Sequence, residues 1–174
     1  MCLSKTLAAG AVALAALVTL TACGGGGETA DGPLSNLPKA STMADIQKAV
    51  LEREVACEGL GQGSEVGYME EEAKDPSWGI QELGSCEDDS GRQVTLLLLG
   101  DMAKFQAALA KDGGHFAVGQ NFAIAAESDY AGERLVQNGL LVLSCNPERR
   151  AKVPSGFEIH EGLVKDCFTT NYSL

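Results

Sequence analysis

The residues best suited to chemistry in this sequence are its cysteines and histidines. They are Cys2, Cys23, Cys57, Cys86, Cys145, Cys167, His115 and His160. No two cysteines form the Cys-x-x-Cys pair of a redox site, and no close pair of cysteine or histidine ligands suggests zinc. The spacing therefore predicts cysteines that form covalent attachments or cross-links. We expect no catalytic, cofactor-binding or metal-binding residues.

Cys23 stands at the end of an apolar stretch at the N-terminus. Residues 1–5 contain Lys5 and no acidic residue, and residues 6–20 carry no charge. A transmembrane helix needs about 20 apolar residues, whereas Gly24 to Gly27 end this stretch early. Residues 1–22 are therefore interpreted as a cleaved signal peptide.

The four residues Leu20-Thr21-Ala22-Cys23 resemble a bacterial lipobox. The resemblance implies a diacylglyceryl group on the Cys23 sulfur, cleavage before Cys23, and a fatty acid such as palmitate on the new amino group. Two or more acyl chains give stable membrane anchoring. The expected location is the extracytoplasmic face of the cell membrane, with the lipid anchor joining the protein to that membrane. The alternative is a secreted protein cut after Ala22, with Cys23 free or in a disulfide.

Residues 23–40 are rich in glycine, proline and small polar residues and have no hydrophobic period. This composition predicts a flexible tether. The remaining residues, 41–174, are long enough for one folded domain.

Four cysteines remain for that domain, an even number as expected for an exported protein with two disulfides. Three pairings are open from the sequence. We favour Cys57–Cys86 and Cys145–Cys167, because each joins neighbouring predicted elements.

The hydrophobic pattern of the domain predicts alternating helices and strands. The expected elements are a helix over 42–55, a strand over 78–85, a buried strand over 93–99, a helix over 102–111, a hairpin over 115–127 turning at Gly119-Gln120-Asn121, a helix over 130–138 and a strand over 140–145. They predict an α+β fold, a two-layer sandwich of an antiparallel sheet backed by helices. Residues 93–145 fit a ferredoxin-like βαββαβ order, although a strand over 78–85 would compete for one edge of the first strand.

This order also resembles small exported lipoproteins of actinobacteria. The shared features are Ser85-Cys86, an acidic turn, the strand over 93–99 and the hairpin residues Gly119, Asn121 and Phe122. The resemblance covers most of residues 41–145. It implies an uncharacterised extracytoplasmic lipoprotein and supplies no catalytic residues.

Several other motifs lack the spacing that their chemistry would need. The glycines of residues 59–67 follow a predicted helix and do not match a dinucleotide-binding loop. Residues 87–89, Glu-Asp-Asp, lack the EF-hand pattern, and residues 70–72, all glutamate, are interpreted as a solvated run. The formal net charge of −11 disfavours binding to nucleic acid.

These observations predict a membrane-anchored extracytoplasmic lipoprotein that is not an enzyme. Its domain would bind an unknown protein or small molecule, or serve as a structural module of the cell envelope. The alternative is a cell-surface enzyme resembling a hydrolase, with a site assembled around His115 or His160.

Overall fold

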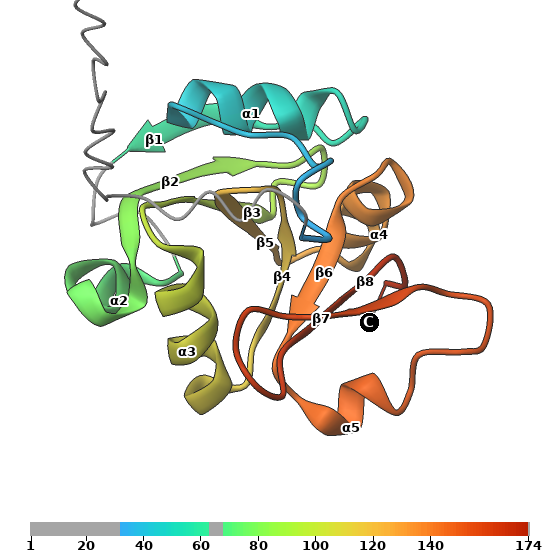
Figure 1. Ribbon diagram of the computed structural model, residues 1–174. Coiled ribbons are helices and arrows are strands. Elements are labelled where there is room, and N and C mark those ends of the chain that lie inside the picture. The colour runs from blue at the N-terminus through green and yellow to red at the C-terminus, as the bar shows by residue number, and fades with distance from the viewer. Residues whose placement is uncertain (1–31, 63–67, 174) are drawn as a thin grey trace, which may run out of the picture.

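A computed structural model describes residues 32–62 and 68–173, which form one open antiparallel sheet with helices packed against it (Figure 1). The strands are β1 (Glu58–Gln62), β2 (Ile80–Glu87), β3 (Gln93–Leu99), β4 (His115–Val118), β5 (Phe122–Ala126), β6 (Leu141–Ser144), β7 (Ile159–Glu161) and β8 (Phe168–Thr170). The helices are α1 (Met43–Leu51), α2 (Glu70–Lys74), the 3₁₀ turn η1 (Pro76–Trp78), α3 (Met102–Asp112), α4 (Asp129–Gln137) and α5 (Pro147–Arg150). The predicted α+β class with an antiparallel sheet is confirmed.

The order of the strands is β1-β2-β3-β5-β4-β6-β8-β7. The unit β3-α3-β4 with β5 between its strands is the predicted split βαβ arrangement. The ferredoxin-like order fails at the last strand, because β6 pairs with β4 instead of β3. The other edge of β3 is already occupied by β2, which pairs with it along most of its length. Of the two strands that could pair with this edge of β3, β2 therefore occupies it and β6 does not.

The central strand β3 is buried on both faces, as expected for its continuous apolar run. Val94, Leu96 and Leu98 belong to one hydrophobic cluster, whereas Leu97 and Leu99 belong to another. The first cluster includes residues of α1 and α4, and the second includes residues of α3. Figure 1 shows α1 and α3 on opposite sides of β3. The sheet is thus covered on both faces, where two layers were predicted.

Polar caps set the beginnings of the helices. Thr42 forms a capping box with Asp45 at the start of α1. The side chain of Asp101 accepts a hydrogen bond from the Lys104 backbone at the start of α3, and Ser128 caps α4 in the same way. These caps explain why the helix starts lie at or within one residue of the predicted ones.

Some segments that were predicted as loops form short elements. The glycine-rich stretch contains β1, which pairs with β2, and the acidic run forms the first turn of α2. The C-terminal tail, for which the sequence left a short helix or strand open over 157–168, contains α5 and the strand pair β7–β8. Each of these elements is only three to five residues long, so its tertiary contacts decide its structure.

The segment 33–40, expected to be part of the tether, lies against the turn between β4 and β5. The Gln120 side chain donates to the carbonyl oxygens of Ser35 and Leu37, each at 2.7 Å. The Asn121 side chain both accepts from and donates to the Ala40 backbone, at 2.9 and 2.7 Å. The folded unit therefore includes these residues.

Within the described ranges, no helix has the length and apolar character needed to cross a membrane.

Candidate ligand-binding pocket

The lipidation site predicted at Cys23 lies outside the described residues, as do Cys2 and residues 23–31 of the expected tether. Attachment of a lipid at Cys23 therefore stays a prediction.

The structure contains both favoured disulfides. Cys57–Cys86 joins the segment after α1 to β2, and Cys145–Cys167 joins the end of β6 to the start of β8. All four cysteines are buried. A cross-link across loops of 29 and 22 residues stabilises a fold by about 3 kcal/mol each in the chain-entropy model. This pair of bonds is typical of a protein that folds outside the cytoplasm.

The acidic turn over 87–89 is organised by Asp88. Its Oδ1 accepts hydrogen bonds from the Ser90 backbone, the Ser90 hydroxyl and the Arg92 backbone. Desolvation acts in the opposite direction, yet these bonds hold the pKa of Asp88 below its ordinary value. This carboxylate is used to build the turn, which explains its place in the sequence without a metal. Within the described residues, no group of three or more acidic, histidine or cysteine side chains is placed to hold a metal ion.

The two histidines lie in different surroundings. His160 lies in the edge strand β7, with its Nε2 3.4 Å from an Oε atom of Glu158. It does not line any of the hollows described below. His115 begins β4 and lines a pocket beside α4.

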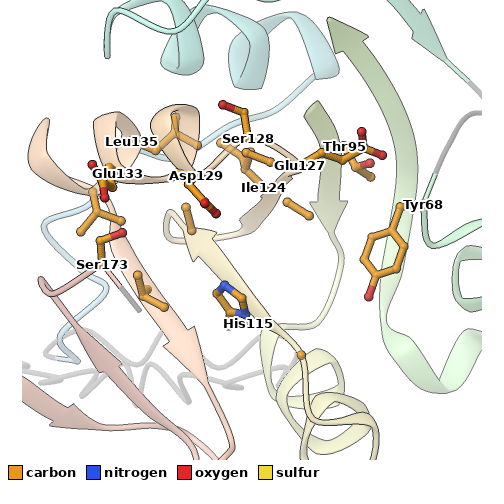
Figure 2. A pocket seen from close by; sticks show the side chains of 17 residues that line it. Tyr68, Thr95, His115, Ile124, Glu127, Ser128, Asp129, Glu133, Leu135 and Ser173 are labelled. Atoms are coloured by element: carbon orange, nitrogen blue, oxygen red, sulfur yellow. The ribbon is translucent and has the colours of Figure 1, made fainter. Parts of the chain in front are cut away.

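This pocket lies between α4 and the sheet and has a volume of about 460 Å³. Strands β4 and β5 pair only at Ala117–Ile124 and Val118–Ala123, so the sheet opens between them toward His115. The pocket extends through this end of the hairpin to Tyr68. Figure 2 shows His115 low in the pocket, with α4 on one side and Tyr68 on another.

The walls combine apolar and acidic side chains. The apolar part is formed mainly by Ala117, Ile124, Leu135, Val136 and Val142. The polar part is formed by Tyr68, Thr95, His115, Glu127, Ser128, Asp129, Glu133 and Ser173. The volume and the mixed lining are those of a site for a small molecule.

The pKa of His115 is lowered from its ordinary value by desolvation and, to a smaller extent, by the positive charge of Arg149. The ring still has exposed surface, so the desolvation is partial. The imidazole is consequently neutral at pH 7. It offers one donor and one acceptor to a ligand in the pocket.

A His115 that acted as a general base would need a nucleophile within hydrogen-bond distance of its ring. Within the described part of the chain, His115 forms no hydrogen bond with a serine or a carboxylate. The Ser128 hydroxyl is engaged as the cap of α4, accepting from the Ala131 backbone at 3.3 Å. The nucleophile–base contact that defines a hydrolytic site is therefore not formed here. The same side chains can bind a ligand as they stand.

Sequence reasoning identified His115 but missed the α4 side of the pocket. Gly132 lies inside α4 and lines the pocket, and a Cβ at this position would meet nothing within 4 Å. An isolated glycine within a helical pattern was the signal available in the sequence.

No family model matches this chain, and comparisons with curated proteins and with solved structures also find no match.

Proposed function

We propose that this chain is a lipid-anchored protein of the extracytoplasmic face of the cell membrane. Its folded domain acts as a non-enzymatic binding module. The observation that carries the location is the pair of buried disulfides in a domain that follows a lipobox-like sequence. A disulfide-braced fold requires an oxidising compartment, and the lipobox supplies a reason for export and attachment.

The binding role is supported by the pocket beside α4. It has the size of a small-molecule site and contains donors and acceptors on an apolar floor. We place the small-molecule role ahead of a purely structural one for this reason.

The anchor is tested by the mass of the tryptic peptide that begins at Cys23 and ends at Lys39. In protein isolated from membranes of a bacterial host with lipoprotein-processing enzymes, we expect this peptide to carry diacylglyceryl and fatty acyl groups. The Cys23→Ala variant should lose the modification and leave the membrane fraction. Cys2→Ala is the matched control and should remain anchored, because Cys2 belongs to the cleaved segment. An unmodified Cys23 in released wild-type protein would contradict the anchor.

A cell-surface enzyme built around His115 is the second candidate, because the pocket places His115 with hydroxyl and carboxylate groups. Hydrolysis of ester or amide probes by the wild-type protein, lost in His115→Asn and retained in His160→Asn, would favour it. We expect no hydrolysis, since His115 has no nucleophile in hydrogen-bond contact among the residues that the structure describes.

A further inference from the structure

Among the residues that the structure describes, three carboxylates line the pocket, Glu127, Asp129 and Glu133, and no lysine or arginine does. Among the described residues, the side chains of Asp129 and Glu133 form no ion pair or hydrogen bond. Figure 2 shows Asp129 extending from α4 on the side of the pocket that faces His115. Two negative groups are thus available to a ligand without the loss of an existing contact.

The neighbouring cations do not neutralise this part of the pocket. Arg149 affects His115 but lines a separate hollow with Asn146 and Lys152. Arg134 of α4 is paired with Glu54. The charge of the site is therefore negative, and it selects for a positive ligand.

The rest of the lining indicates that the ligand has an apolar body. Ala125 and Ala126 of β5 are half-buried and line the same space as the carboxylates with apolar surface. Tyr68 adds an aromatic ring, stacked at 6.5 Å on Phe116. An aromatic face attracts an organic cation, whereas a bare metal ion would leave the apolar side unfilled.

Gly132 is an independent sign that the space is left open. Glycine inside a helix lowers the stability of that helix by about 1 kcal/mol relative to alanine. Neither a positive φ nor a close neighbour requires glycine here, because a Cβ would meet nothing within 4 Å. The missing side chain instead leaves free volume on the face of α4 that lines the pocket, next to Glu133.

We propose that this pocket binds a small organic cation, an ammonium group with an apolar body. The ammonium group lies against Asp129 and Glu133, and the body lies against the half-buried Ala125 and Ala126 of β5. This inference rests on the proposed binding function and names its ligand class.

The test compares three probes of similar size with the mature protein purified in detergent from host membranes. The probes are 2-phenylethylammonium, the neutral 2-phenylethanol and the anionic 3-phenylpropanoate. Titration calorimetry gives their affinities, and the NMR signals of the His115 ring report whether they enter this pocket. We expect the cation to bind at least about tenfold more tightly than either of the others, as one well-placed charge contact provides.

Three variants locate the binding. Asp129→Asn combined with Glu133→Gln should weaken binding of the cation about tenfold and leave the affinity for the alcohol unchanged. Gly132→Leu fills the pocket from α4 and should abolish binding of all three probes, while its thermal melting shows that the fold is intact. Glu52→Gln removes a carboxylate from outside the pocket, beyond the end of α1, and should bind the cation as the wild type does.

Equal affinity for the three probes, preference for the anion, or no binding of any probe would overturn the inference. So would cation binding that survives both the double substitution and Gly132→Leu. The mass of the Cys23 peptide is read on the same preparation. If the wild-type protein is instead released with an unmodified Cys23, the same probes are titrated against the released protein, so a failure of the anchor is distinguished from a failure of the ligand class.

Discussion

At the scale of single residues, two glycines show opposite demands on space. Gly119 lies in the turn between β4 and β5, where an added Cβ would lie 2.6 Å from the Pro38 carbonyl oxygen and would overlap the Phe122 ring. Gly132 lies in α4, where an added Cβ meets nothing. The same substitution at these two sites therefore has opposite expected effects.

We predict that Gly119→Ala lowers the free energy of unfolding by about 2 kcal/mol, because both the ring and the segment at Pro38 must shift. Gly132→Ala should raise it by about 0.5–1 kcal/mol through helix propensity. Urea denaturation of the two variants and the wild type measures both changes. Equal effects of the two substitutions would contradict the close packing at Gly119.

At the scale of elements, α3 holds the C-terminal segment in place through Gln106. This side chain is fully buried, and its Oε1 accepts hydrogen bonds from the backbones of Leu163 and Val164 at 2.7 and 3.2 Å. The Sγ atoms of Cys145 and Cys167 lie 3.5 and 3.6 Å from the backbone carbonyl oxygen of Gln106. Disulfide sulfur carries no hydrogen, so this contact is one of packing.

We predict that Gln106→Met, similar in volume but without the acceptor, lowers the free energy of unfolding by about 2 kcal/mol. Two backbone donors would lose their partner, so the amides of Leu163 and Val164 should exchange hydrogen faster. Gln137→Met on the exposed end of α4 is the control and should change neither quantity. Unchanged exchange in Gln106→Met would mean that the disulfide alone positions this segment.

The same scale shows what the sequence could and could not predict. The bounds of β3 agree with the predicted strand because its apolar run has no competing structure, and Asp101 marks the next helix. The short β1 has no such pattern, and its partner β2 decides its conformation. The place of β6 beside β4 follows from the occupied edge of β3, which local pattern cannot reveal.

The candidate site shows the same division. His115 was identifiable as a titratable group at the start of a predicted strand. Its neighbours Asp129 and Glu133 come from the next helix, and Tyr68 comes from a distant loop. Only the folding of α4 over the open end of the β4–β5 hairpin brings these residues together.

At the scale of the whole molecule, acid weakens the fold through groups whose pKa values are lowered. The pKa of Asp45 is lowered mainly by the hydrogen bond from the Ser41 backbone. The pKa of Glu161 is lowered mainly by the hydrogen bond from the Arg150 side chain. Such a carboxylate stabilises the fold above its ordinary pKa, and this contribution disappears as pH falls through the lowered value. His115 follows the same rule, because its neutral form is favoured in the folded state.

We predict that unfolding stability falls in two stages on acidification. The first begins near the ordinary histidine pKa of 6.5 and belongs to His115, which faces Asp129, Glu133 and Arg149. The second begins near pH 4, where the carboxylates take up protons. Melting temperatures measured across this range should lose the first stage in His115→Asn and keep it in His160→Asn. A first stage that persists in His115→Asn would assign it to another group.

The bonds from Gln120 and Asn121 to the segment 35–40 bear on how the proposed lipoprotein is oriented at the bilayer. The stretch from Cys23 to Gly32 reaches at most about 30 Å even when fully extended. If Cys23 carries the proposed lipid, this reach limits how far the turn end of the β4–β5 hairpin can lie from the bilayer. His115 marks the other end of β4, so the proposed anchor would attach beside the turn of the hairpin and the pocket would lie at its opposite end.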